Sequence, residues 1–178
     1  MSDMAEVLDA VLEPGAREQA QRVIERVRDA ELRLATAESC TAGLLAAVLT
    51  DVEGCGHVFD RGFVTYELTA KCDMLDLPEE IVQHNAAVNE AVARLMAERT
   101  LARSEAHIAI GITGFAGPCE EDQEEGLVFI GCAAQDRETQ VREEHFGEIG
   151  RAAVRAKALA AAFEMIAEAT AALQQRRA

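Results

Sequence analysis

The sequence contains no tryptophan, a single tyrosine and few aromatic residues of any kind. It therefore lacks the aromatic side chains interleaved with basic ones on which single-stranded nucleic acids stack. Positive charge is also scarce, because 17 lysines and arginines face 32 aspartates and glutamates, for a formal net charge of −15. This excess of negative charge repels phosphate backbones, so we expect no nucleic-acid partner.

The spacing of cysteines and histidines in the sequence also shows no metal-binding or disulfide motif. The five cysteines are odd in number, scattered and never arranged as C-x-x-C, and the four histidines show no ligand spacing beside them. The pattern favours neither a disulfide framework nor a zinc site, so no metal or cofactor is expected. The first residues are acidic where a signal peptide is basic, and no apolar run reaches membrane length, so we expect a cytoplasmic protein without a membrane partner.

What remains is a chain of ordinary globular composition. Apolar residues make up 49% of its 178 positions, which suits one domain with a sizeable core. We expect an N-terminal extension over 1–15, with an amphipathic piece at 7–12, followed by a single domain over 16–176.

Hydrophobic periodicity predicts alternating helices and strands in this domain. Helices are predicted over 16–30, 44–52, 67–75, 88–103 and 151–174, and strands over 32–35, 62–66, 106–112, 128–134 and 139–146. The last two strands form a hairpin. The alternation predicts a three-layer α/β/α sandwich whose five-stranded mixed sheet is mostly parallel, with one reversed strand.

Three polar turns follow predicted strands, at 38–41, from Tyr66 onward and at 113–114. In open α/β sheets, ligands bind at the carboxyl ends of the strands. The three turns are therefore expected to converge on one site.

Ser39 and Lys71 are the pair best suited to chemistry at this place. A lysine kept neutral by burial can remove the proton of a serine nucleophile. Taken alone, each residue has a simpler interpretation: Ser39 or Thr41 caps the following helix, and Lys71 is exposed to solvent. Cys40 is a rival nucleophile, since a helix N-terminus lowers the pKa of a thiol.

Four further features are less specific. The Tyr66 hydroxyl is a candidate for orienting Lys71 or relaying a proton, although a rim or core tyrosine is the simpler interpretation. The Thr113–Gly114 turn lets backbone approach a substrate or is a plain turn. Arg151 pairs with an anion or is solvated. The acidic run 119–125 is predicted to be a solvated loop.

Four ordered motifs together carry a specific resemblance. They are T-A-E-S-C-T-A-G at 36–43, R-G-F-V-T-Y at 61–66 followed by Lys71, A-V-N-E at 87–90, and T-G-F-A-G-P at 113–118. Over about residues 16–170 the chain resembles the C-terminal domain of the CinA competence/damage-inducible protein family, which is also the family of the nicotinamide mononucleotide deamidases. The resemblance implies a three-layer α/β fold and metal-independent hydrolysis of nicotinamide mononucleotide to nicotinate mononucleotide and ammonia.

The resemblance also implies roles for individual residues. It implies a serine nucleophile at Ser39, a lysine base at Lys71 and a supporting group at Tyr66. The residues implied in shaping the site or contacting a small pyridine nucleotide are Glu38, Cys40, Thr41, Gly43, Thr113, Gly114 and Arg151. A homodimer is the family-like expectation for the assembly.

Several positions depart from the family pattern. Ala42 replaces a glycine of the turn and, being an alanine, is expected to require a negative φ. The segments 67–69 and 84–89 differ, an acidic run at 119–125 replaces a Gly-rich loop that contains lysine, and an aspartate is missing before Arg151. These changes leave open an inactive member that binds a nucleotide or a partner protein. A nucleic-acid factor is a third class that the net charge fits badly.

Overall fold

The computed structural model describes residues 15–177, which form a five-stranded sheet in the order β2-β1-β3-β4-β5. The strands are β1 (Leu34–Glu38), β2 (Phe59–Val64), β3 (Ile108–Gly114), β4 (Leu127–Ala134) and β5 (Gln140–His145). β1 pairs in parallel with β2 and β3, whereas β4 is antiparallel to both β3 and β5. Four strands therefore point the same way and β4 alone is reversed, which confirms the predicted sheet.

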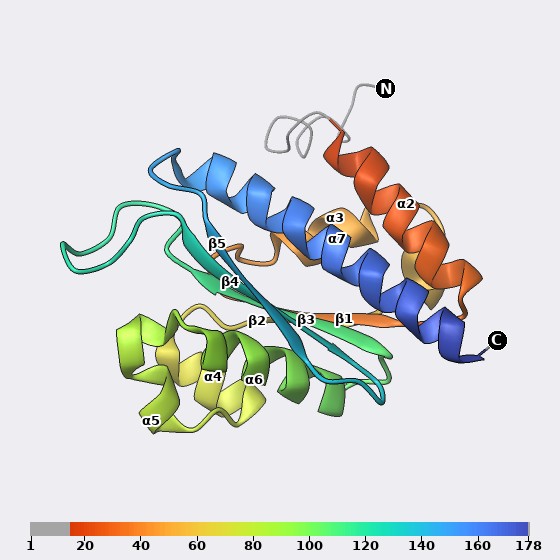
Figure 1. The fold of residues 1–178 in the computed structure, drawn as a ribbon, viewed down its shortest axis with the longest axis horizontal. Coiled ribbons are helices and arrows are strands. Elements are labelled where there is room, and N and C mark those ends of the chain that lie inside the picture. The colour runs from red at the N-terminus through yellow and green to blue at the C-terminus, as the bar shows by residue number, and fades with distance from the viewer. Residues whose placement is uncertain (1–14, 178) are drawn as a thin grey trace.

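Helices cover both faces of this sheet, which makes a three-layer α/β/α sandwich (Figure 1). One layer holds α2 (Ala16–Asp29), α3 (Leu44–Thr50) and α7 (Arg151–Arg177), and the other holds α4 (Leu68–Leu75), α5 (Glu79–Val82) and α6 (Glu90–Ala102). Two 3₁₀ turns, η1 (Cys55–His57) and η2 (His84–Ala87), complete the described elements. The sequence prediction missed α5 and both 3₁₀ turns, which are too short to show a hydrophobic period.

The alternation of side chains along β3 divides the core between the two layers. Ile108, Ile110 and Ile112 face α2 and α7 and join a large apolar cluster there. On the other face Gly111 is paired with Gly131 of β4 beneath α6. A Cβ at Gly131 would lie 2.3 Å from the carbonyl oxygen of Ala93. Because neither glycine has a side chain, the backbone of α6 packs directly against the backbone of β3 and β4.

The helical faces predicted from periodicity are the buried ones. Along α2 these are Ala20, Val23, Ile24 and Val27, and along α7 they include Leu159, Phe163, Ile166 and Leu173. Strand boundaries were less accurate. β1 starts two residues later than expected and continues to Glu38, and β2 ends at Val64 instead of Tyr66.

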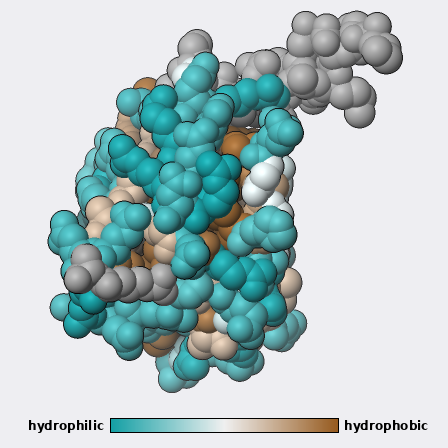
Figure 2. All heavy atoms as spheres, turned by 90° about the vertical axis from the view of Figure 1, so that its right-hand side faces the viewer, coloured by the Kyte–Doolittle hydropathy of each residue, from teal (hydrophilic) through white to brown (hydrophobic). Residues whose placement is uncertain are grey.

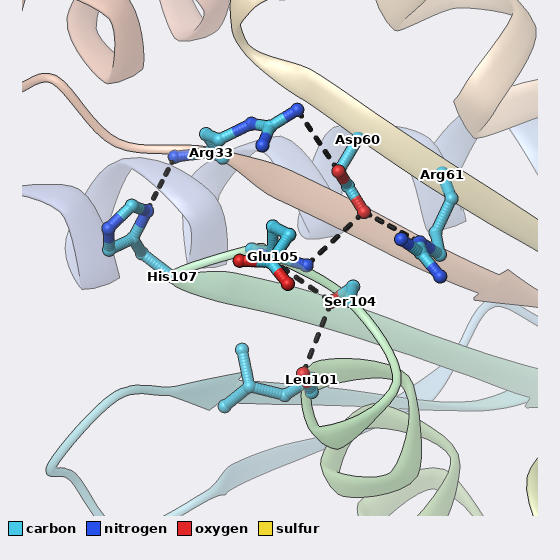
Figure 3. Close-up of polar contacts among 8 residues, drawn as sticks. Arg33, Asp60, Arg61, Leu101, Ser104, Glu105 and His107 are labelled. Atoms are coloured by element: carbon cyan, nitrogen blue, oxygen red, sulfur yellow. Dashed lines mark hydrogen bonds and ion pairs between the residues drawn. The ribbon is translucent and has the colours of Figure 1, made fainter.

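A buried carboxylate fastens the beginning of β2 to its neighbours (Figure 3). Asp60 accepts hydrogen bonds from Arg61 Nε at 2.6 Å and from the amide of Glu105, and it pairs with Arg33 at 3.0 Å. Burial raises the pKa of Asp60, but the Arg61 and Glu105 hydrogen bonds and the two arginine charges outweigh it and leave that pKa below its ordinary value. The amide of Arg33 is in turn held by Nδ1 of His107.

The face at the right-hand side of Figure 1 is largely hydrophilic, with apolar atoms visible mainly in recesses (Figure 2). Across residues 15–177, no helix combines the length and the apolar character needed to cross a membrane. The amphipathic piece expected at 7–12 lies outside the described residues.

Candidate active site

A cleft of about 220 Å³ opens at the carboxyl ends of β1 and β3, beside the segment that follows β2. It is lined by Ser39, Cys40, Tyr66, Lys71, Ala86, Val88, Thr113, Gly114, Phe115, Ala116, Gly117, Pro118 and Arg151. The three polar turns singled out from the sequence therefore do converge. Of the residues expected there, Glu38, Thr41 and Gly43 lie outside the cleft lining.

Ser39 and Lys71 are in direct contact. Lys71 Nζ lies 3.0 Å from Ser39 Oγ, although the two residues are 32 positions apart in the chain. The same nitrogen also donates to the carbonyl oxygens of Thr65 at 2.9 Å and Tyr66 at 3.2 Å. Lys71 is only 1% exposed and Ser39 8% exposed, so the interpretation of Lys71 as a solvated surface lysine is wrong.

The surroundings of Lys71 change its protonation. Burial lowers the pKa of Lys71 below its ordinary value of 10.5, while the charges of Cys40, Glu67 and Cys72 act in the opposite direction. Among residues 15–177, its hydrogen-bonding partners are two carbonyls and a hydroxyl, and no carboxylate is one of them. The site therefore favours the neutral amine more than water does.

Cys40 has the opposite character from the one expected of a rival nucleophile. The expectation that the helix N-terminus lowers its thiol pKa is wrong: burial raises the pKa of Cys40 to about 12, against a smaller lowering by Arg155. The thiol stays protonated at neutral pH. Cys40 contributes its backbone and its place in the cleft lining, and Ser39 is the better candidate for a nucleophile.

Glu38 is the residue that caps the following helix. Its buried carboxylate accepts hydrogen bonds from the amides of Leu45 at 3.0 Å and Ala46 at 2.8 Å. Capping by Ser39 or Thr41 is therefore wrong, since the N-cap position of α3 is Gly43 and no N-cap side chain bonds there. The carboxylate of Glu38 also occupies the positive end of α3, so this end is not free for a substrate anion.

The turn between Ser39 and α3 contains a strained alanine. Ala42 has a φ of +54° and Gly43 a φ of +87°, both in the left-handed region. The expectation that Ala42 requires a negative φ is thus wrong. A left-handed conformation costs a non-glycine residue about 1 kcal/mol of conformational free energy. In this turn the Ala42 amide donates a hydrogen bond to the Ser39 carbonyl at 3.0 Å.

Thr113 supports one wall of the cleft. Its hydroxyl donates to the carbonyl of Ala87 at 2.7 Å and is buried. The three successive residues 85–87 all have positive φ values, between 49° and 61°. The side-chain amide of Asn85 donates a second hydrogen bond in this wall, to the carbonyl of Val88 at 2.7 Å. This wall was missed from the sequence because no glycine marks its left-handed backbone.

The remaining predicted residues lie on the rim. Tyr66 is 56% exposed, and its contact with Lys71 is made by its carbonyl oxygen. Gly114 lines the cleft, where a Cβ would collide with backbone atoms of β4. Arg151 is exposed and its guanidinium lies against Gly117. Arg155, one turn further along α7, was not predicted, and its Nε donates to the carbonyl of Cys40 at 2.7 Å.

The acidic run 119–125 forms a loop next to the rim, as expected. Glu124 pairs with His145 of β5 at 2.7 Å, and this hydrogen bond raises the pKa of His145. At the base of the loop, the amide of Phe146 donates to the carbonyl of Gly126 at 3.0 Å. Among the residues that the structure describes, no three histidine, cysteine, aspartate or glutamate side chains gather in a way that could hold a metal ion.

Comparisons with solved structures place this architecture among known proteins. The competence/damage inducible protein CihA from Agrobacterium tumefaciens superposes with a TM-score of 0.84 at 37% identity, covering 88% of this chain and 96% of that one. A competence-damaged protein (CinA) superfamily protein from Escherichia coli superposes with a TM-score of 0.79 at 30% identity, covering 90% of each chain.

Sequence comparisons agree with the structural ones. The chain is 40% identical to CinA-like proteins of Akkermansia muciniphila over 132 residues and of Syntrophobacter fumaroxidans over 144 residues. These matches cover 73% and 80% of this chain but 32% and 34% of the relatives. The chain thus spans about a third of the length of the curated relatives it matches. The CinA C-terminal domain model matches residues 16–170, and the chain therefore belongs to the CinA C-terminal domain family.

Proposed function

We propose that this protein is a metal-independent amidohydrolase that converts the carboxamide of nicotinamide mononucleotide, or of a closely related pyridine nucleotide, to a carboxylate and ammonia. The observation that carries the proposal is the contact of 3.0 Å between Lys71 Nζ and Ser39 Oγ. Both groups lie in one cleft, and burial lowers the pKa of the lysine. Family membership and the resemblance of the motifs supply the reaction class.

The partners of Lys71 suit a general base. A neutral amine has two N–H donors and one lone pair. The carbonyl oxygens of Thr65 and Tyr66 only accept, so they take the two N–H groups. The lone pair is then directed at the third partner, the hydroxyl of Ser39, whose proton it can accept.

The first half of the reaction acylates the enzyme. Ser39 Oγ bonds to the carboxamide carbon as its proton passes to Lys71, and the carbonyl π electrons move to the oxygen. When this tetrahedral intermediate collapses, the C–N bond breaks and the nitrogen leaves as ammonia with the proton from Lys71. The neutral lysine and an acyl ester on Ser39 remain.

The second half releases the acid. Lys71 accepts a proton from a water molecule that attacks the ester carbon, and a second tetrahedral intermediate forms. The bond from that carbon to Ser39 Oγ breaks, and the serine oxygen recovers the proton from Lys71. The carboxylic acid loses its own proton to solvent, which completes the cycle without a metal or a cofactor.

Backbone amides beside Ser39 are suited to stabilising the oxyanion of both intermediates. The amide of Ser39 itself donates to Ile112 in the sheet, and that of Ala42 donates to Ser39. Within the described residues, the amides of Cys40 and Thr41 have no backbone acceptor. Donors that are fixed before the reaction are the usual means of stabilising such an intermediate.

The cleft lining also fits a planar ring that carries an amide. Apolar or aromatic side chains at Val88, Phe115 and Pro118 stand around the polar Ser39–Lys71 pair. Arg151 supplies a positive charge at the mouth, where the phosphate of a nucleotide would extend.

The direct test is ammonia release from nicotinamide mononucleotide by the wild-type protein and by Ser39→Ala and Lys71→Ala. We expect turnover in the wild type and its loss in both variants, with circular dichroism and melting temperature showing that both remain folded. Wild-type turnover that persists in Ser39→Ala would refute the assignment of the nucleophile. A wild type that hydrolyses none of a panel of pyridine-nucleotide amides would refute the enzymatic function.

A second candidate function is binding without hydrolysis. The observation that favours it is the acidic loop at 119–125 beside the cleft rim, because added carboxylates oppose a phosphate there. Calorimetric titration of the wild type with nicotinamide mononucleotide separates the two functions. Heat of binding without ammonia release supports a binding protein, whereas turnover supports the enzyme.

A further inference from the structure

Arg155 contacts the backbone directly behind the proposed nucleophile. Its Nε donates to the carbonyl oxygen of Cys40 at 2.7 Å, across 115 positions of the chain. The side chain is half-buried, whereas that of Arg151 one turn earlier is exposed. The contact joins α7 to the turn that follows β1, and none of the roles proposed above uses it.

Two successive peptide groups follow Ser39 and share one pattern. The Ser39 carbonyl accepts from the amide of Ala42 at 3.0 Å, and the Cys40 carbonyl accepts from Arg155. The N–H groups of the same two peptides belong to Cys40 and Thr41, and within residues 15–177 neither has a backbone acceptor. Each of the two peptides is thus held at its oxygen, and its N–H makes no backbone hydrogen bond within the described residues.

We infer that Arg155 is a positioning residue for the oxyanion site, because its hydrogen bond to the Cys40 carbonyl fixes the residue that follows Ser39 and lines the cleft, and so holds the Cys40 N–H in place as a donor. The hydrogen bond from the Ala42 amide to the Ser39 carbonyl polarises the Ser39–Cys40 peptide and strengthens this N–H as a donor. This inference rests on the proposed function, since it assigns Arg155 a part in stabilising the same tetrahedral intermediates.

The charge of Arg155 adds to this effect. In the part of the chain that the structure describes, no carboxylate pairs with Arg155, although carboxylates outnumber basic residues overall. Within the described residues no ion pair therefore neutralises its positive charge, which lies against Cys40, next to the proposed nucleophile. A fixed cation in a partly buried site stabilises that charge more in the intermediate than in the neutral amide.

The test uses Arg155→Met, which removes the hydrogen bond and the charge, and Arg155→Lys, which keeps the charge and loses the planar guanidinium. Arg94→Met is the matched control. Arg94 also donates to a backbone carbonyl, that of Thr139, but lies outside the cleft lining. Circular dichroism and melting temperature report whether each variant folds.

Two readouts separate positioning from a merely structural role. The first is the separate measurement of kcat and KM for carboxamide hydrolysis. The second is the affinity for pyridine-3-boronic acid, followed by boron NMR. The boron atom bonds to Ser39 Oγ, the serine proton passes to Lys71, and the resulting tetrahedral anion imitates the intermediate.

We expect Arg155→Met to lower kcat by about tenfold to a hundredfold with little change in KM, and to weaken boronate binding by a similar factor. Arg155→Lys should lie between this variant and the wild type, and Arg94→Met should match the wild type. Wild-type kcat and boronate affinity in Arg155→Met would overturn the inference. So would a loss of kcat that accompanies a lower melting temperature while boronate affinity stays unchanged.

Failure of the proposed function looks different. In that case the wild type itself neither hydrolyses a pyridine-nucleotide amide nor forms a tetrahedral boronate on Ser39, and Arg155 has no reaction to support. A wild type that forms the boronate as strongly as Arg155→Met does would instead overturn only the role of Arg155.

Discussion

The contact between α6 and the sheet yields a prediction whose magnitude follows from the structure. In Gly131→Ala, the added Cβ would lie 2.3 Å from the carbonyl oxygen of Ala93 and 2.8 Å from its carbonyl carbon. Ordinary contacts begin near 3.4 Å, so α6 and β4 must separate by about 1 Å. Because the obstructing atoms are backbone, no rotamer change can relieve the collision.

Overpacking of this kind costs typically 1–3 kcal/mol, and we expect about 3 kcal/mol because both partners are backbone. For a domain of this size, 1 kcal/mol corresponds to about 2–4 °C of melting temperature. Gly131→Ala should therefore melt about 6–12 °C below the wild type. Activity should also fall, since the wall that contains Ala86 and Val88 leads directly into α6.

Thermal unfolding followed by circular dichroism measures this change, with Gly56→Ala as the control. Gly56 has nothing within 4 Å of an added Cβ and no positive φ, so its substitution should leave the melting temperature nearly unchanged. If the melting temperature of Gly131→Ala equals that of Gly56→Ala, the close packing of α6 on the sheet does not limit the stability of this fold.

Three further predictions concern the site. The value of kcat/KM should rise with pH through the Lys71 pKa, which lies below 10.5 because burial favours the neutral base, whereas Lys71→Arg should be inactive throughout a pH profile. Cys40→Ala should keep most activity, and iodoacetamide should not inactivate the wild type at neutral pH, because the pKa of this thiol is about 12. Glu38→Gln should lower the free energy of unfolding by about 1–3 kcal/mol in a urea titration, since a carboxamide cannot accept from both α3 amides as the carboxylate does.

The fold was predictable where side-chain periodicity sets the structure. The buried faces of α2 and α7, the hairpin of β4 and β5 and the single reversed strand all follow from the apolar pattern. The end of β1 did not follow, because Glu38 looks like a turn residue in the sequence. It can be buried in the strand only because two amides of α3 meet its carboxylate.

For the candidate site, the sequence allowed us to predict which turns converge, but not the detailed contacts between their residues. Ser39 and Lys71 come together because their segments follow adjacent parallel strands. The carbonyl partners of Lys71 depend on how the chain leaves β2, which no local pattern encodes. The same holds for the left-handed backbone at Ala42 and for the contact of Arg155 with Cys40, which joins residues that are remote in sequence.

Because β2 lies at the edge of the sheet, the Ser39–Lys71 contact depends on whether this strand stays paired with β1. The two carbonyls that hold Lys71 follow this strand, and an edge strand has a neighbour on one side only. Asp60 fastens its beginning, and the amide of Thr65 fastens its end to Glu38 at 2.8 Å. A subglobal opening of β2 would disconnect Lys71 from Ser39 while the other strands stay paired. Heat inactivation should then precede global unfolding, and hydrogen exchange of the β2 amides should report the free energy of that opening.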